Sequence, residues 1–350
     1  MPTAAPETLP AIWYHDPDRF QEEKETIFKR HWWMIGPEAL LWRPGDYVSG
    51  EIAGLPVFVI RSRDGALVGF HNVCRHRAGP LVREPCGHID RLRCTYHGWL
   101  YDFEGRLKKA PGLALGEDID SEQFSLFKVR AQSWNGMVFV TLSEDTPDLF
   151  DWLGDIPKTA KKFPAASSLS YQGEAEKEGR CNWKTYGDNS CEGYHVPLVH
   201  QSLKTALGKE SVSIHCVERG QYIGFDVTYN SSASDPTRSG KGYWIYKFPG
   251  LLLHFAATSF NAESVIPVSP GSIVLKRFFW ADESSTACGR SRSKAIMDSA
   301  SQVMAEDLAI CEAVQRNLEG GIYEKGRLSP SEEPGTIYFQ KLVRLALELD

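Results

Sequence analysis

The spacing of hydrophobic and polar positions changes along the 350-residue chain and separates regions of different expected secondary structure. Asp18 to His31 is expected to be helical. Between about Trp42 and Leu142, the pattern becomes short β-rich runs punctuated by Gly and Pro, which is typical of a compact all-β module. The strands expected there are Pro56–Arg61, Leu67–Val73, His88–Cys94 and Gly136–Leu142.

The second half of the chain mixes helix and strand patterns. A helical run is expected from about Asn182 to His195, several strands between Ser211 and Ala281, and a long amphipathic helix from about Ser293 to Leu318. Ser231 to Gly242 is rich in turn-forming residues and is expected to be a loop between strands. This alternation predicts an α+β architecture.

The patterns together predict two domains. The first is an all-β domain over residues 42–145. The second consists of residues 1–41 and 146–350 and is expected to be an antiparallel sheet flanked by helices.

The last long helix carries an acidic residue where an apolar one is expected. At 100° per residue its apolar stripe consists of Ala300, Val303, Met304, Leu308, Cys311, Val314 and Leu318. Asp307 falls in the middle of this stripe, whereas Glu306 points away from it and fits a solvated charge. A carboxylate that faces the core needs a partner, and a metal ion is one candidate.

Composition narrows the classes of protein to consider. The 39 Lys and Arg against 45 Asp and Glu give a net charge of −6, which argues against nucleic-acid binding through bulk charge. No run of roughly 18 apolar residues suggests a membrane span, so a soluble cytoplasmic protein is expected. The 8 Cys in 350 residues are too dilute for a disulfide scaffold and are expected to be ligands or core residues.

The predicted β module contains two short segments that each pair a thiol with an imidazole. Cys74 and His76 form the first, and Cys94 and His97 form the second after the seventeen residues 77–93. Structural zinc usually takes its cysteines as one pair and its histidines as another. A Rieske 2Fe-2S centre instead takes one Cys and one His from each loop. A Rieske cluster is therefore expected, with a zinc site and plain core packing as the alternatives.

A second group of possible ligands lies in the other half of the chain. His195 and His200 are five residues apart, and Pro197 between them is expected to end the helix, so that His200 comes from the turn beyond. Two histidines with one carboxylate form the facial triad of non-heme Fe(II) oxygenases. Asp307 is the expected carboxylate, and Asp188 is the first alternative. As core residues, the two histidines would need no metal.

These segments resemble the Rieske non-heme iron oxygenases, specifically their terminal oxygenase component. The resemblance rests on N-V-C-R-H-R and C-T-Y-H-G-W in the first half, and on N-W-K, D-N, E-G-Y-H-V-P-L-V-H and M-A-E-D-L-A-I-C-E-A-V-Q in the second. It implies that Cys74, His76, Cys94 and His97 hold the cluster. It also implies that His195, His200 and Asp307 hold mononuclear Fe(II).

The resemblance has further implications for catalysis and for partners. Glu192 matches the acidic residue that links the two metal sites in the family, and Asp188 is a second candidate catalytic acid. No G-x-G-x-x-G nucleotide motif occurs, so electrons from NAD(P)H are expected through a separate reductase, with or without a ferredoxin. The resemblance also implies a homotrimer.

The expected activity is O2-dependent hydroxylation of a small organic substrate. Choline and carnitine oxygenase-like members and aromatic-ring dioxygenase α subunits share these motifs. The alternating Trp244, Tyr246 and Phe248 form either sheet core or a wall of the iron pocket. An aromatic substrate is favoured because no acidic residue adjoins this wall and Lys247 could face a carboxylate. The alternatives are oxidation of a quaternary amine and a Rieske electron carrier without oxygenase chemistry.

Overall fold

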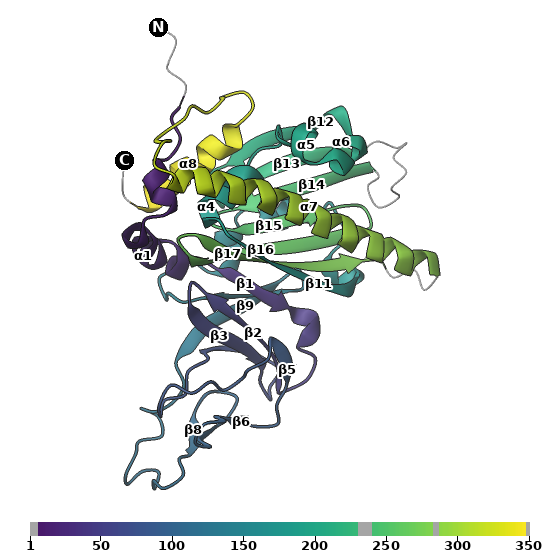
Figure 1. Cartoon of the computed structure of the whole chain (residues 1–350). Coiled ribbons are helices and arrows are strands. Elements are labelled where there is room, and N and C mark those ends of the chain that lie inside the picture. Colours follow the sequence, from purple (N-terminus) through teal and green to yellow (C-terminus); the bar gives the residue numbers. More distant parts are fainter. Residues whose placement is uncertain (1–5, 230–239, 283–286, 348–350) are drawn as a thin grey trace. The chain divides into compact units, whose positions relative to one another are not determined.

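A computed structural model describes residues 6–229, 240–282 and 287–347 of the chain (Figure 1). The chain forms two compact units: a smaller one, Lys29–Leu149, and a larger one made of Met1–Phe28 and Phe150–Asp350. Residues 29–41 thus belong to the smaller unit, although the sequence pattern grouped them with the second domain. They do so because strand β1 (Trp33–Pro37) pairs with β10 (Met137–Thr141) of that unit.

The smaller unit is all-β. Its seven-stranded antiparallel sheet has the order β1-β10-β9-β4-β3-β2-β5, and a three-stranded sheet has the order β6-β7-β8. Besides β1 and β10, the strands are β2 (Asp46–Ile52), β3 (Leu55–Arg61), β4 (Leu67–His71), β5 (Cys86–His88), β6 (Leu92–Arg93), β7 (Leu100–Tyr101), β8 (Leu107–Lys109) and β9 (Lys128–Trp134). The single strand expected over His88–Cys94 is instead two, because β5 pairs with β2 and β6 pairs with β7.

The larger unit is built on a second seven-stranded antiparallel sheet, with the order β11-β17-β16-β15-β14-β13-β12. Its strands are β11 (Ser170–Gly179), β12 (Leu207–Val217), β13 (Tyr222–Tyr229), β14 (Gly240–Lys247), β15 (Leu251–Phe255), β16 (Ser259–Ser269) and β17 (Ser272–Ala281). Of the loop expected over residues 231–242, residues 240–242 begin β14 and the rest lies outside the described residues.

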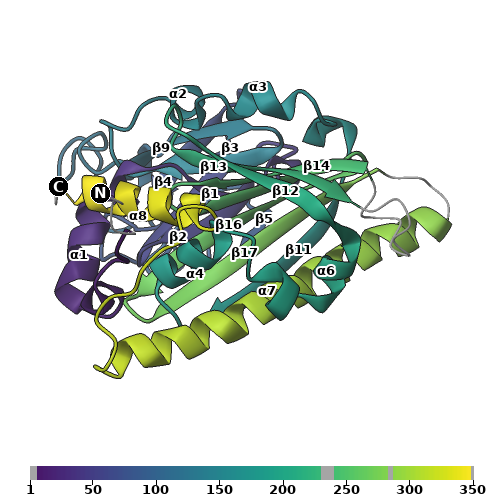
Figure 2. The same cartoon turned by 90° about the horizontal axis from the view of Figure 1, so that it is seen from above.

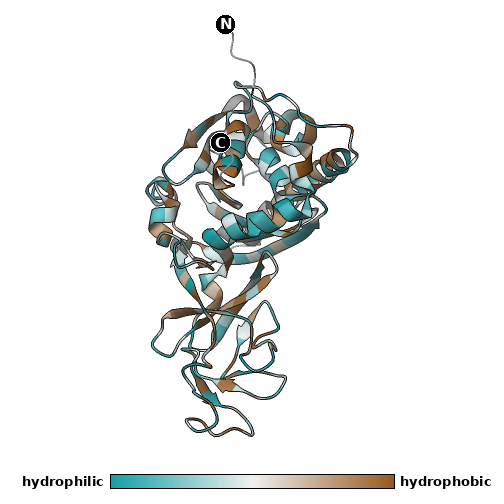
Figure 3. Ribbon diagram, turned by 90° about the vertical axis from the view of Figure 1, so that its left-hand side faces the viewer, coloured by the Kyte–Doolittle hydropathy of each residue, from teal (hydrophilic) through white to brown (hydrophobic). Residues whose placement is uncertain are grey.

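Helices cover this sheet (Figure 2). The long α7 (Ala287–Glu319) contacts β11, α4 (Trp183–Ser190) contacts β16, and α8 (Pro334–Ala346) contacts β12 and β13. The remaining helices of the chain are α1 (Pro17–Thr26), α2 (Leu149–Leu153), α3 (Ile156–Ala160), α5 (Val196–Val199) and α6 (Gln201–Ala206). The 3-10 turns are Ala11–Tyr14, Phe28–Arg30, Ala166–Ser168 and, in the smaller unit, Glu38–Leu40. Figure 3 shows helices with both hydrophilic and hydrophobic residues, as expected for helices that cover one face of a sheet.

Local sequence explains where α4 lies. Asn182 caps its N-terminus: the Asn182 side chain accepts a hydrogen bond from the Lys184 amide at 2.9 Å, a common N-cap interaction. Within the helix, a Cβ at Gly187 would lie 2.5 Å from Cζ of Phe339 in α8 and 2.9 Å from the Tyr246 hydroxyl. Glycine therefore permits the close packing of α4 between α8 and the sheet.

No helix in the described part of the chain is both long enough and apolar enough to cross a membrane.

A buried ion pair joins α1 to α4. Lys184 Nζ lies 2.5 Å from Glu23 Oε1, both side chains are fully buried, and the Trp183 indole donates to Glu23 Oε2 at 2.8 Å. Because burial penalises the ammonium form, the pKa of Lys184 is lowered despite the nearby Glu23 carboxylate.

Replacing Glu23 by Gln is expected to destabilise the larger unit by about 3–5 kcal/mol, because it leaves the buried Lys184 ammonium without a counter-charge. In the double variant Glu23→Gln/Lys184→Met, the amide still accepts from Trp183 and the charge is gone, so most of the stability should return. Chemical denaturation of the three proteins measures this. Equal midpoints for the single and double variants would contradict a charge effect.

Candidate active site

The two candidate histidines lie on either side of a short helix. Helix α4 ends at Ser190, residues 191–194 form a connection, and α5 then runs over Val196–Val199, directly after His195 and directly before His200. The expectation that Pro197 ends a helix is wrong. It lies in the first turn of α5, where a missing N–H costs nothing. His200 does follow in the turn beyond.

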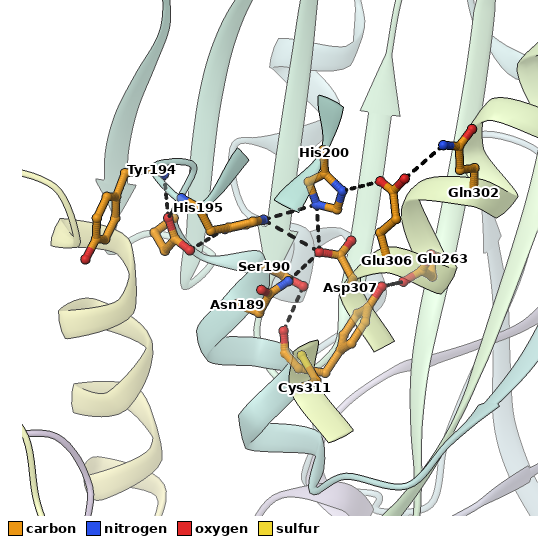
Figure 4. A network of polar contacts seen from close by, with 12 residues as sticks. Asn189, Ser190, Tyr194, His195, His200, Glu263, Gln302, Glu306, Asp307 and Cys311 are labelled. Atoms are coloured by element: carbon orange, nitrogen blue, oxygen red, sulfur yellow. Dashed lines mark hydrogen bonds and ion pairs between the residues drawn. The ribbon is translucent and has the colours of Figure 1, made fainter. Parts of the chain in front are cut away.

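His195, His200 and Asp307 meet at one point (Figure 4). The Nε2 atoms of the histidines are 3.2 Å apart, and Asp307 Oδ1 lies 3.0 Å from His200 Nε2 and 3.6 Å from His195 Nε2. One ligand atom from each residue lies within 4.8 Å of the others. Asp307 is 8% exposed, so the expected burial of this carboxylate is confirmed.

Each of the three residues has a further polar partner, and for the two histidines this partner lies at Nδ1, the nitrogen that faces away from this point. His195 Nδ1 contacts Glu192 Oε1, and His200 Nδ1 lies 2.7 Å from Glu306 Oε2. The Asn189 amide donates to Asp307 Oδ1 at 2.7 Å. Glu306 is therefore not the solvated charge that its position off the apolar stripe indicated.

The electrostatics of this cluster suit a cation. Burial disfavours ionised Asp307, but hydrogen bonds from His195 and His200 outweigh it and hold the pKa of Asp307 well below its usual range. Burial likewise opposes the charge on His195, yet Asp307 and Glu192 raise its pKa to about 9. The same negative potential would stabilise a divalent metal ion that displaces the protons. Two imidazoles and one carboxylate form the donor set of a facial triad.

Asp188 lies apart from the triad. Its carboxylate accepts from the Tyr14 hydroxyl at 2.6 Å and from the Gln340 amide at 2.9 Å. Burial raises the pKa of Asp188 to about 7, against the hydrogen bonds from Tyr14 and Gln340. Asp307, and not the alternative Asp188, is thus the carboxylate that the fold brings to the two histidines.

A cavity opens in front of the triad. His195, His200 and Asp307 line it together with Trp244 of β14 and His254 of β15. Aromatic side chains form much of the remaining wall: Tyr186, Phe225, Tyr229, Tyr246 and Phe255. The cavity has the general character of a small-molecule site, with apolar walls and a few polar groups.

Only two of the three aromatic residues that were expected to share one face line the cavity. Trp244 and Tyr246 line the cavity, but Phe248 packs against Trp183 and Phe339 in the core. Lys247 is buried with its Nζ 4.0 Å from the Trp152 ring centroid. The expectation that Lys247 faces a substrate carboxylate is therefore wrong, because its neighbours in the fold are an indole and a backbone carbonyl.

The polar groups of the cavity wall are neutral or paired. Burial and the nearby Arg277 lower the pKa of His254 to about 3, and its Nδ1 lies 2.9 Å from Asn261 Oδ1. Arg277, which also lines the cavity, forms an ion pair with Glu263 at 2.5 Å. Sequence analysis missed these residues because their roles arise from strand pairing across the sheet.

In the smaller unit, the two Cys-His segments form matching loops. The Cys74 amide donates to the Gly79 carbonyl, and the Cys94 amide donates to the Trp99 carbonyl, both at 2.9 Å. Tight closure requires glycine, since a Cβ at Gly79 would lie 2.9 Å from Cys94 Sγ.

These loops bury their thiols and bring their imidazoles together. Cys74 and Cys94 are both 2% exposed, and the ring centroids of His76 and His97 are 4.5 Å apart. The Tyr101 hydroxyl lies 3.2 Å from Cys74 Sγ. Two thiols and two imidazoles, one of each from each loop, fit the donor set of a Rieske cluster.

Comparison with known proteins gives the same division. Residues 31–120 match the Rieske 2Fe-2S domain, and residues 166–348 match the ring hydroxylating alpha subunit, catalytic domain. The chloroplastic choline monooxygenase of Arabidopsis thaliana is 26% identical over 95% of this chain and 82% of its own length. The chlorobenzene dioxygenase alpha subunit of a Cupriavidus strain is 33% identical over 52% of this chain and 42% of its own.

The fold is also similar to that of solved structures. The quaternary ammonium Rieske monooxygenase CntA superposes with a TM-score of 0.88, at 22% identity, over 98% of this chain and 96% of that one. The chain therefore belongs to the ring-hydroxylating alpha-subunit family, and is the terminal subunit of a Rieske oxygenase, an oxidoreductase with a 2Fe-2S domain and a catalytic domain that binds mononuclear iron.

Proposed function

We propose that His195, His200 and Asp307 bind the catalytic Fe(II). The observation that supports this assignment is their convergence at the end of an aromatic-lined cavity, with the second nitrogen of each imidazole held by a carboxylate. Such carboxylate contacts fix the tautomer and orientation of histidine ligands. Cys74, His76, Cys94 and His97 are the corresponding proposal for the cluster.

The side chains around these sites position the reactants. When bound, the cluster supplies single electrons and the mononuclear iron supplies oxygen activation. Glu192 contacts both the Nδ1 and the backbone amide of His195, so it fixes this imidazole, and we assign it the role of linking the two metal sites. The proposal also includes a separate NAD(P)H-dependent reductase, with or without a ferredoxin. It further includes assembly of the chain as a homotrimer.

For the substrate we propose a small compound with an N-methylated ammonium group. Faces of Trp and Tyr attract such cations, and Trp244 lies between Tyr229 and His254 in the cavity wall. His254 is held neutral, and the nearby Glu263 carboxylate offsets part of the charge of Arg277. Two of the similar proteins described above are named for choline or quaternary ammonium oxidation.

Hydroxylation of an aromatic ring is the second candidate. The same wall can stack a ring, and the chlorobenzene dioxygenase alpha subunit is similar over half of the chain. The buried position of Lys247 removes the argument for an aromatic acid.

The two metal sites should be separable by mutation. Wild type should hold about three irons per chain. Asp307→Ala is expected to lose about one iron and all activity while it retains the cluster spectrum, because the triad loses its anionic donor. Cys74→Ser should lose the cluster spectrum and keep the mononuclear iron. Metal analysis and electron paramagnetic resonance measure both, with Asp298→Asn, an exposed acid on α7, as control. Full iron content in Asp307→Ala would contradict the triad.

Substrate class can be tested with the purified oxygenase, a reductase and NADH. Choline and carnitine-like compounds are expected to give oxygen uptake coupled to release of an aldehyde, because hydroxylation of a carbon next to nitrogen yields an unstable product. The balance is one O2, two electrons and two protons for one hydroxyl group and one water. Benzene and benzoate derivatives serve as the comparison. Coupled ring hydroxylation without any turnover of amines would establish the second candidate instead.

Trp244→Leu is expected to raise KM for the ammonium substrate by about 2–30-fold, the equivalent of a cation-π interaction of roughly 0.5–2 kcal/mol. Inhibition by a neutral tert-butyl analogue of the same shape should change much less, because it lacks the charge. Trp42→Leu, at an indole that is 86% exposed in the smaller unit, is the matched control. Equal losses for the charged and neutral compounds would argue for simple apolar packing at Trp244.

A further inference from the structure

His200 lies between two consecutive residues of α7. Its Nε2 faces Asp307 Oδ1 at 3.0 Å, and its Nδ1 faces Glu306 Oε2 at 2.7 Å (Figure 4). His200 is 1% exposed, so its ring is shielded from solvent. Neighbouring side chains on a helix diverge by about 100°. The two nitrogens of an imidazole also diverge, which allows one ring to contact both carboxylates.

Glu306 is itself held in place. Its second oxygen, Oε1, accepts a hydrogen bond from the Gln302 amide at 2.8 Å. Gln302 and Glu306 are four residues apart and therefore adjacent on the helix surface. The Glu306 side chain is 26% exposed, so it lies at the edge of the site and not within the core. The chain Gln302–Glu306–His200 thus approaches the triad from its solvent side.

We propose that Glu306 is a positioning residue for the metal site, acting through His200. An anionic acceptor at Nδ1 favours the tautomer with the proton on Nδ1, which leaves the Nε2 lone pair for the metal. It also fixes the plane of the ring. Glu306 does not serve as a ligand, because its carboxylate contacts Nδ1, whereas His195 and Asp307 contact Nε2. This inference rests on the triad proposed above.

The arrangement gives both histidines the same kind of support from different sources. Glu192 supports His195 from three residues away in the chain, whereas Glu306 supports His200 from 106 residues away, on the helix that also supplies Asp307. A shift of α7 would therefore move the carboxylate ligand and the orientation of His200 together. Helix α7 therefore fixes His200 and Asp307 together.

Metal affinity tests this role without recourse to turnover. The full-length protein with its cluster is depleted of mononuclear iron by a chelator and titrated with Co(II), whose visible absorption reports binding. Glu306→Ala should weaken Co(II) binding by about 10–100-fold, the usual effect of removing such a partner. Glu306→Gln should lose less, because its amide oxygen can still accept from Nδ1. Asp298→Asn removes a negative charge elsewhere on α7 and should bind Co(II) like wild type.

The comparison with Asp307→Ala separates the possible failures. Loss of binding in Asp307→Ala together with wild-type affinity in Glu306→Ala overturns the positioning role but not the triad. Wild-type affinity in both variants overturns the triad. If Glu306→Ala does not fold, Glu306→Gln serves as the test. A Co(II) affinity and a Co(II) spectrum identical to those of wild type in this variant would overturn the positioning role.

Discussion

The larger unit depends on one buried negative charge in the apolar face of a helix. Asp307 lies among the packed side chains of α7, where an ionised carboxylate without partners would be costly. Its partners come from α4, from the residue before α5 and from the residue after it: Asn189, His195 and His200. These groups reach Asp307 because of three features of the fold: the position of α7 on the sheet, the end of α4 at Ser190 and the short length of α5.

The two metal sites distribute burial and charge differently. In the smaller unit, the thiols of Cys74 and Cys94 are buried, while His76 is exposed. In the larger unit, His200 and Asp307 are buried together, and carboxylates surround the imidazoles. The first arrangement suits a cluster whose imidazole-bound iron lies near the surface. The second suits a divalent cation at the wall of a cavity, where the nearby carboxylates offset its positive charge.

The features that could be predicted from the sequence are those that depend on the spacing of residues close together in the chain. The Cys-His loops, the histidine pair and the place of Asp307 on a helical stripe each follow from a few adjacent positions. Contacts between distant segments could not be predicted in this way. Glu306 contacts His200 from 106 residues away, and β15 meets β16 so that His254 lies opposite Asn261. Periodicity indicates which side of a helix faces the core, but not that a flanking carboxylate meets an imidazole there. Likewise, alternation indicated a shared face for Trp244, Tyr246 and Phe248, whereas β14 ends at Lys247 and Phe248 packs against Phe339 of α8 in the core.

The larger unit is discontinuous in sequence, and this affects the order in which the protein can fold during synthesis. The smaller unit is one continuous stretch, Lys29–Leu149, and all of its strands have left the ribosome before α4 is made. The segment that precedes the smaller unit emerges before that unit, but its partners are made after it: Glu23 pairs with Lys184, and the Leu9 amide pairs with Gln340, 331 residues later. Domains generally fold as units in the order of synthesis. The two Cys-His loops can thus be complete while the segment before the smaller unit, with the apolar surface of Phe20 and Leu9, still lacks its partners. Until α8 has emerged, that segment lacks its contacts in this helix and is exposed to aggregation and to chaperones.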